Sequence, residues 1–348
     1  MKTLSVLFSL ALLGLMMTGC GTKRQYFEPE TLSGKISYDG SLPSSMVDST
    51  REGATLANGQ IITKKGLSKV TFPEGFMYLN EDKGRYIGAS QCGELKIIDE
   101  NKKVLFTQKF SGIVASATLR ENLLALVLGS NELLLVDIRD GKHLLALKQD
   151  NVFVLDSRIA APFFLGDLIV FPTLDGKLVI VDEKTRKPVR DVVVSNEKFF
   201  GNIIYLQVLG DRLVAATKSK VVSINPKNMG LLDADVKDVI VLENRIFVFT
   251  KDGRVILTDA DLKVLKERKF PFATFAGTIY GNFVYMIERG GYIIATDLDL
   301  VYSCLDLRPK SRDSIMQETG LSAEKTGSIL VELSILGLIR EISRHYYV

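Results

Sequence analysis

The 348-residue sequence contains no tryptophan, only two histidines and only three cysteines. With His143 and His345 as its whole supply of imidazole, the chain can hardly build a histidine-based metal centre or a Ser-His-Asp triad. Cys20, Cys92 and Cys304 are too few and too far apart for a disulfide framework or a Cys-x-x-Cys pair. We therefore expect a non-enzymatic protein that uses no metal and no cofactor.

The chain also lacks a large excess of either charge, because its 44 basic and 41 acidic side chains leave a net charge of only +3. A field this weak does not indicate nucleic acid or an anionic membrane surface as the main partner. The hydrophobic share of 46% and the charged share of 24% are those of a soluble globular protein, which excludes disordered and collagen-like classes.

Residues 1–19 have the pattern of a secretory signal peptide. Lys2 supplies the positive start, residues 4–17 form an apolar run, and Thr18 and Gly19 are small. The run is too short for a comfortable membrane span. The sequence therefore predicts export from the cytoplasm.

The segment Met17-Thr18-Gly19-Cys20 resembles the lipobox of bacterial lipoproteins, in which cleavage falls before a cysteine that receives a diacylglycerol. Met17 departs from the Leu, Val or Ile that is commoner at the first lipobox position. A plain signal peptide and an apolar first helix are the alternatives. We predict that Cys20 is lipidated, that residues 20–34 form the anchor and its tether, and that the protein faces the periplasm from the outer membrane, as Gly21 implies in lipoproteins of this kind.

One unit recurs through the middle of the chain: an apolar strand, a tight turn, and a second strand that ends in Asp or Asn. Each terminal residue lies six positions after a turn residue, and successive copies are spaced by 38, 45, 43, 34 and 38 residues. The six terminal residues are Asp99, Asp137, Asp182, Asn225, Asp259 and Asp297.

Such a period fits four short strands, which is the size of one propeller blade. A weaker seventh copy surrounds residues 54–63, so the sequence predicts a mainly β fold with about seven blades over residues 35–305, closed with help from residues 35–38. A β-sandwich or an open solenoid of hairpins is the alternative. We interpret the recurring Asp as a turn cap and expect the loss of Asp182 to destabilise the fold.

The segment 136–142, Val-Asp-Ile-Arg-Asp-Gly-Lys, resembles the pyrroloquinoline-quinone-type propeller repeat. The quinone enzymes of that family seat their cofactor with tryptophans and a cysteine pair, which this chain lacks. In its lipobox, tether and repeated blades the chain is similar to the BamB-type lipoproteins of the β-barrel assembly machinery. This resemblance implies a protein-binding scaffold, although no interface residue matches individually, and a last blade lost near residue 306 would explain a smaller ring.

Beyond residue 306 the apolar period changes to about 3.6, which indicates helices. The pattern predicts a helix over 311–319, a second helix over 323–336 that Ser322 caps, and a hairpin of 338–342 with 345–348. We predict a winged-helix module over residues 306–348. Its sequence resembles the C-terminal module of the DNA-processing protein DprA.

Lys325, Arg340 and Arg344 are the candidate nucleic-acid contacts of this module. Six basic and six acidic residues between positions 306 and 348 cancel, which is a poor electrostatic footprint for DNA. The charge pattern therefore argues against DNA and favours a structural or protein-contact module.

Three functions fit the sequence. The leading one is a lipid-anchored propeller scaffold whose partners are proteins, including a β-barrel assembly protein. The alternatives are a surface or periplasmic binding protein of unrelated role and a DNA-binding protein that acts through the winged helix.

Overall fold

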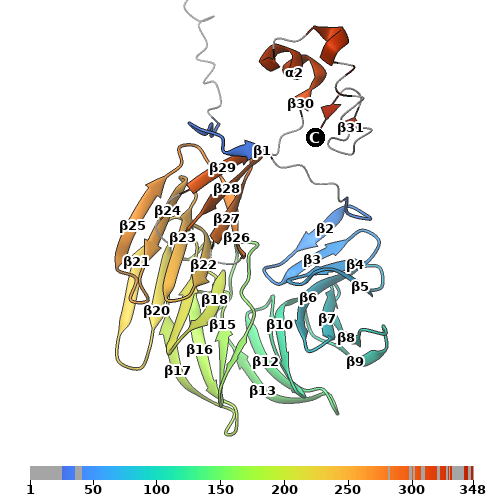
Figure 1. Ribbon diagram of the computed structural model, residues 1–348. Coiled ribbons are helices and arrows are strands. Elements are labelled where there is room, and N and C mark those ends of the chain that lie inside the picture. The colour runs from blue at the N-terminus through green and yellow to red at the C-terminus, as the bar shows by residue number, and fades with distance from the viewer. Residues whose placement is uncertain are drawn as a thin grey trace, which may run out of the picture.

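A computed structural model describes residues 26–35, 41–280, 283–297, 300, 302–306, 310–319, 322–326, 328, 330, 341–343 and 346–347. Within these residues the chain forms seven antiparallel blades arranged as a β-propeller (Figure 1). This confirms the mainly β fold and the number of blades that the repeat predicts.

In every blade the strands follow one another in sequence order. Blade 1 contains β2 (Met46–Ser49), β3 (Gly53–Leu56), β4 (Gln60–Thr63) and β5 (Gly66–Thr71), and blade 2 contains β6 (Phe76–Asp82), β7 (Arg85–Ser90), β8 (Glu94–Asp99) and β9 (Val104–Lys109). Blade 3 contains β10 (Val114–Arg120), β11 (Leu123–Leu128), β12 (Glu132–Asp137) and β13 (Lys142–Lys148), and blade 4 contains β14 (Phe163–Leu165), β15 (Leu168–Pro172), β16 (Lys177–Asp182) and β17 (Lys187–Val193).

Blade 5 contains β18 (Tyr205–Leu209), β19 (Arg212–Ala216), β20 (Lys220–Ile224) and β21 (Met229–Asp233), and blade 6 contains β22 (Val236–Leu242), β23 (Arg245–Thr250), β24 (Arg254–Thr258) and β25 (Val264–Lys269). Blade 7 contains β26 (Phe275–Tyr280), β27 (Phe283–Glu288), β28 (Tyr292–Thr296) and β29 (Tyr302–Asp306).

The hairpin turns have the backbone that the sequence pattern requires. The predicted turn residues adopt positive φ in five of the six copies: Gly93, Asn131, Gly176, Gly253 and Gly291. At Gly176 a Cβ atom would lie 2.7 Å from two backbone carbonyl oxygens, so only glycine fits this turn.

The carboxylate that ends the third strand caps the turn after it, as predicted. Asp182 Oδ1 accepts a hydrogen bond from the Thr185 backbone N–H at 2.7 Å. In the same way Asp259 Oδ1 accepts two backbone N–H groups, those of Asp261 and Lys263, both at 2.9 Å. These side chains satisfy donors that the tight turn leaves without backbone partners.

The core lies between the blades. In β23, Ile246 and Val248 belong to the cluster shared with blade 5, whereas the alternating Phe247 and Phe249 belong to the cluster shared with blade 7. Because successive strand residues point to opposite faces, a blade with apolar residues on both faces packs against two neighbours. The propeller follows from this repeated two-sided burial.

The N-terminal segment joins the last blade. β1 (Gly34–Lys35) pairs in parallel with β29, and Gly34 lies opposite Leu305. Phe27 packs edge-on against Phe270 and Tyr292, with ring centroids 6.0 and 5.7 Å apart. β1 thus adds an outer strand to blade 7, and the role of residues 35–38 in closing the ring stays a prediction, because residues 36–38 lie outside the described part of the chain.

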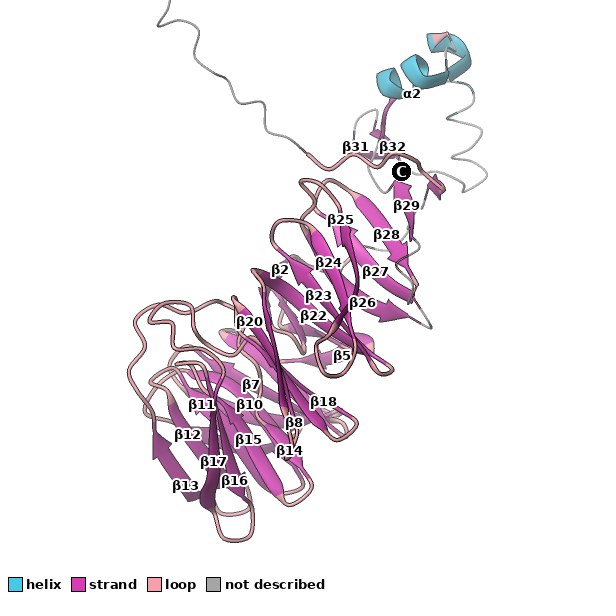
Figure 2. Ribbon diagram, turned by 90° about the vertical axis from the view of Figure 1, so that its left-hand side faces the viewer, coloured by secondary structure: helices cyan, strands magenta, loops and turns pink. Residues whose placement is uncertain are grey.

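The C-terminal residues form a small unit beside the propeller (Figure 2). β30 (Lys310–Ser311), β32 (Tyr346–Tyr347) and β31 (Glu341–Ser343) form a sheet in that order, and α2 (Arg312–Thr319) follows β30 directly. Residues 323–326 are helical, but most of the predicted helix 323–336 lies outside the described residues. These elements do not by themselves establish a winged-helix module.

Candidate protein-binding surface

Two long connections distinguish blades 4 and 5 from the others. Residues 149–162 lead from β13 into blade 4, and residues 194–204 lead from β17 into blade 5. The corresponding connections elsewhere are much shorter and span residues 72–75, 110–113, 234–235 and 270–274. Loops on a rigid scaffold are common positions for binding residues.

Buried asparagines tie the two loops to each other and to the propeller. The Asn202 side chain accepts a hydrogen bond from the Asp156 backbone N–H and donates one to the Arg158 carbonyl oxygen, both at 2.8 Å. Asn131 donates to the Asp150 carbonyl oxygen and accepts the Leu174 N–H, also at 2.8 Å. These hydrogen bonds therefore attach both loops to the propeller and to each other.

Aromatic side chains stand exposed on these loops. Phe153 is 86% exposed, and Phe199 and Phe200 of the second loop are also exposed. Phe153 and Phe199 line a cavity of about 470 Å³ between the loops. Exposed aromatic side chains beside a hollow are typical anchors of protein interfaces.

Phe200 combines this exposure with an unusual backbone. Its φ of 56° lies in the left-handed region, which is rare for a bulky residue and costs on the order of 1–3 kcal/mol. Its N–H donates to the Val154 carbonyl oxygen at 3.0 Å, and Lys218 Nζ lies 4.8 Å from its ring centroid. Such backbone strain persists only where the surrounding structure maintains it, and strained residues are common at functional positions.

Charged groups surround the apolar centre of this surface. Lys177 Nζ lies 2.7 Å from Asp175 and 3.1 Å from Asp150. Burial acts to raise the pKa of Asp175, but hydrogen bonds from Lys177, Thr173 and Asn131 outweigh it and hold the pKa below its usual range. The surface therefore presents apolar aromatics inside a rim of both charges.

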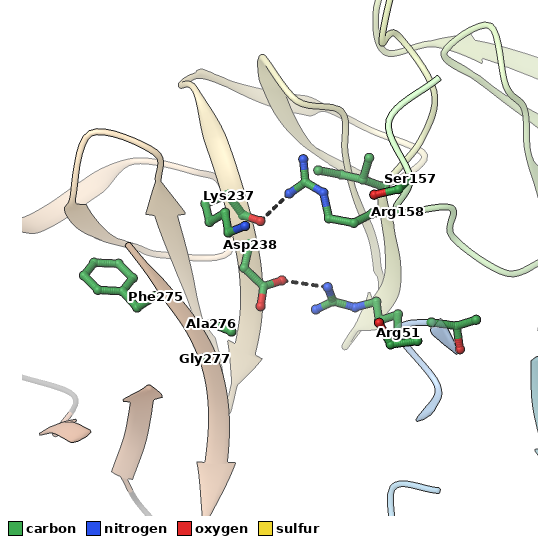
Figure 3. Close-up of a pocket in the computed structure, with 11 residues that line it drawn as sticks. Arg51, Ser157, Arg158, Lys237, Asp238, Phe275, Ala276 and Gly277 are labelled. Atoms are coloured by element: carbon green, nitrogen blue, oxygen red, sulfur yellow. Dashed lines mark hydrogen bonds and ion pairs between the residues drawn. The ribbon is translucent and has the colours of Figure 1, made fainter. Parts of the chain in front are cut away.

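The propeller centre holds a second polar site, which Figure 3 shows. Arg51, in the turn between β2 and β3, reaches across to blade 6, where it donates to Asp238 Oδ1 at 2.7 Å and to the Val239 carbonyl oxygen at 2.6 Å. Its guanidinium carbon lies 4.2 Å from the centroid of the Tyr205 ring of blade 5. Arg51 thereby links blade 1 to blades 5 and 6.

Arg158 adds a connection from the first long loop to the same place (Figure 3). It binds the carboxylate of Asp156 and donates to the carbonyl oxygen of Lys237. Burial favours the neutral form of Asp156, but the hydrogen bonds from Arg158 prevail and lower its pKa. Both members of the Arg51–Asp238 ion pair, together with Arg158, line a cavity of about 350 Å³ at this point.

Among the described residues, no three His, Cys, Asp or Glu side chains gather as metal ligands. His143 lies at the edge between blades 2 and 3, where its Nε2 is 2.9 Å from Gln108 Nε2 and its ring stacks on Phe110. No helix within the described ranges is long and apolar enough to cross a membrane.

Of the four candidate site residues predicted from the sequence, the structure describes only Lys325. Lys325 is exposed in the helical segment 323–326, where its backbone N–H donates to Ser322 Oγ at 3.4 Å. Cys20, Arg340 and Arg344 lie outside the described residues. The loop aromatics were missed, although the spacings of 45 and 43 residues before Asp182 and Asn225, the two longest, mark the two long connections.

The fold and the two loops together define a seven-bladed β-propeller that carries exposed aromatic side chains on residues 149–162 and 194–204. The chain is 32% identical to the plasminogen-binding protein PgbB of one Helicobacter pylori strain over 82% of its own length and 31% identical to that of a second strain over 84%. It spans 61% and 63% of these curated relatives. No protein-family model matches the chain.

Solved structures support the fold at low sequence identity. BamB from Moraxella catarrhalis aligns with a TM-score of 0.61 and 13% identity, over 75% of this chain and 87% of that structure. The C-terminal WD40 domain of Sif2 aligns with a TM-score of 0.56 and 12% identity, over 73% and 82%. These likenesses concern the architecture alone.

Proposed function

We propose that the protein is a non-enzymatic propeller that binds other proteins through the surface formed by residues 149–162 and 194–204. The exposed aromatic group around Phe153 is the observation that carries the proposal. A solvent-exposed phenylalanine on a fixed loop gains apolar burial on binding and loses little conformational freedom. The mixed rim of Lys177, Asp150 and Glu197 supplies orientation.

The membrane position is part of the same proposal. The signal-like residues 1–19 and the lipobox-like Cys20 support an exported protein that lipid chains hold at the outer membrane. A tether after Cys20 leaves the propeller free to meet partner proteins. Whether it faces the periplasm or the cell surface decides which partners it can reach.

Plasminogen is the first partner to test, because the curated relatives are named for binding it. Surface plasmon resonance with immobilised plasminogen compares the wild-type chain with a Phe153→Ala, Phe199→Ala double variant. Loss of two aromatic anchors weakens an interface by about 2 kcal/mol or more, roughly 30-fold in affinity. The single variants Ile113→Ala and Val189→Ala, at exposed apolar positions outside residues 149–162 and 194–204, serve as controls and bind like the wild type.

A β-barrel assembly protein is the second candidate partner, which the BamB-like architecture favours. Crosslinking in membranes followed by affinity purification of the chain tests it with the same variants. Equal recovery of every partner with wild-type and double-variant chains would contradict the loop surface. Binding by the double variant that is lost in a control variant would do so as well.

We also propose that residues 306–348 form a winged helix that contacts protein rather than DNA. The order β30-β32-β31 and the adjoining α2 support the fold, and the balanced charge supports the partner class. A duplex-DNA titration of the full chain at two salt concentrations tests it. A sub-micromolar affinity that falls steeply with salt, and weakens in a Lys325→Ala, Arg340→Ala, Arg344→Ala variant, would contradict this assignment.

A further inference from the structure

The connections between blades all start at the same end of the propeller. In blades 1 to 6 the first residue of the connection donates its backbone N–H to a carbonyl oxygen in the turn between the second and third strands of its own blade. Three such pairs are Gln149 with Asn131, Val194 with Gly176 and Phe270 with Gly253, at 3.1, 2.9 and 2.8 Å. We call this end, which carries residues 149–162, 194–204 and 270–274, the connection face.

The N-terminal segment meets the propeller at the connection face. Phe27 is 6% exposed and packs against Phe270, the first residue of the connection from blade 6. It also packs against Tyr292, which follows the turn between β27 and β28. The chain is therefore held at Phe27, on the connection face of blades 6 and 7.

A short tether joins this point to the proposed lipid anchor. Cys20 precedes Phe27 by seven positions, and an extended chain spans at most about 3.6 Å per residue, so the two lie within about 25 Å of each other. The other end of the propeller is further away by the length of a strand, roughly 20 Å for the six residues of β25. Lys23 and Arg24 of the tether suit anionic headgroups. Lipid on Cys20 therefore holds the connection face of blades 6 and 7 close to the membrane.

Two exposed aromatic side chains adjoin the Phe27 site. Tyr26 is 67% exposed, and Phe272 is 56% exposed in the connection that begins with Phe270. Phe272 has a φ of 63° in a tight turn, in which the Ala273 N–H donates to the Phe270 carbonyl oxygen at 3.1 Å. A bulky residue is rare in such a backbone. Tyrosine is enriched at the boundary between lipid and water, and an exposed phenylalanine beside it can enter the acyl region.

We propose that the connection face is turned toward the membrane that holds Cys20, and that Tyr26 and Phe272 contact its lipid. This inference rests on the lipid anchor of the proposed function. Residues 149–162 and 194–204 lie on the same face beside blades 4 and 5, so a partner held in the same membrane can reach them.

Tryptophan fluorescence tests the orientation, because the chain contains no tryptophan and a single substitution reports on one position. The lipidated chain with Phe272→Trp is placed in vesicles of phosphatidylethanolamine and phosphatidylglycerol with brominated acyl chains. We expect quenching by the bromine, and emission at shorter wavelength than in a soluble Cys20→Ser chain with the same substitution. Val264→Trp is the matched control, because Val264 is 46% exposed and begins β25 at the other end of blade 6, where bromine should not quench it.

The outcomes separate this orientation from the anchor and from the loop surface. A wild-type chain that does not float with the vesicles removes the anchor, and this proposal with it. A chain that floats but shows no more quenching at Phe272→Trp than at Val264→Trp keeps the anchor and overturns the orientation. Emission that is already shifted in the Cys20→Ser chain means that the chain's own residues cover this position, which also overturns the lipid contact. Quenching of Phe153→Trp together with Phe272→Trp supports the orientation but contradicts protein binding by the loops.

A longer tether tests the step that depends on its length. About 20 glycine and serine residues inserted after Gly21 add a mean reach of roughly 25 Å and leave the propeller unaltered. We expect the quenching at Phe272→Trp to fall in this chain. Unchanged quenching overturns the role of the tether, and Tyr26→Trp replaces Phe272→Trp throughout if that variant does not fold.

Discussion

An Asp or Asn ends the third strand in six of the seven blades, and where its side chain accepts hydrogen bonds, the donors are N–H groups of the turn that follows. Asp99 Oδ1 accepts the N–H groups of Asn101 and Lys103, both at 2.9 Å, as Asp259 does two residues and four residues downstream. A carboxylate fits because its oxygen is close enough to accept two donors of one turn. The recurrence therefore reflects folding of each blade and needs no shared ligand.

Replacing Asp259 by alanine should lower the free energy of unfolding by about 1 kcal/mol, because two turn N–H groups lose their acceptor. Urea denaturation at pH 7 measures the change. Asp233→Ala is the control, since Asp233 is exposed and its nearest cation, Lys220 Nζ, lies 3.9 Å away. An Asp259→Ala chain as stable as the wild type, with weaker partner binding, would instead make this residue part of a binding site.

Turn residues and caps could be read from the sequence because their effects are confined to a few neighbouring residues. Arg51 could not, although it fixes blade 1 to blades 5 and 6. Its partners Asp238 and Tyr205 lie 187 and 154 positions away, and nothing in a single sequence links them. A residue whose partners are distant is predictable only after the ring is known.

At the scale of elements, the strands were easier to predict than the loops between blades. A strand buried on both faces has a continuous apolar run, such as Leu123–Leu128, and the run is bounded by turn residues. The connection 149–162 has no period of its own. Its shape depends on contacts with distant parts of the chain. Asn202 of the second loop accepts a hydrogen bond from the Asp156 N–H, and Arg158 donates one to the carbonyl oxygen of Lys237 in blade 6.

The same loop provides a prediction for pH. Asp156 has a folded-state pKa below its ordinary value of 3.8, so the folded chain binds this proton less readily than the unfolded chain. The stability from its pair with Arg158 is present above about pH 4 and is lost as the pH falls through the lowered value. Asp156→Asn should therefore cost about 1 kcal/mol at pH 7, allowing for partial exposure, and much less at pH 2.5.

Urea midpoints of wild type and Asp156→Asn at the two pH values check this expectation. Asp233→Asn is the control, and it should show little difference at either pH because Asp233 is exposed. A cost of Asp156→Asn that does not shrink on acidification would assign the loop's stability to contacts other than this carboxylate.

For the whole molecule, the period of the repeat was enough to predict a propeller and the number of blades. The tight hairpin turns then determine the register of neighbouring strands, because turn type and loop length fix which residues of a hairpin pair. The exposed side of blade 7 was not predicted. Ile287 is 56% exposed although Phe249, at the same position of the equivalent strand in blade 6, is fully buried, and only the arrangement of the blades in space shows this difference.

The membrane anchor is the last property of the whole molecule that can be tested directly. We expect mature protein to carry lipid on Cys20, because the residue follows an apolar run and two small residues. Each buried CH₂ group contributes about 0.8 kcal/mol, so a multiply acylated cysteine holds the chain on the membrane through a high-salt wash.

Cys20→Ser should therefore shift the protein from the membrane fraction to the soluble fraction, and mass spectrometry of the wild type should find the lipid on the N-terminal residue. Cys92→Ser is the matched control, because Cys92 is an exposed free cysteine within blade 2 and its loss leaves the anchor in place. Two results would contradict lipidation of Cys20. One is a wild-type N-terminus with unmodified Cys20, and the other is equal membrane retention of the Cys20→Ser and Cys92→Ser chains.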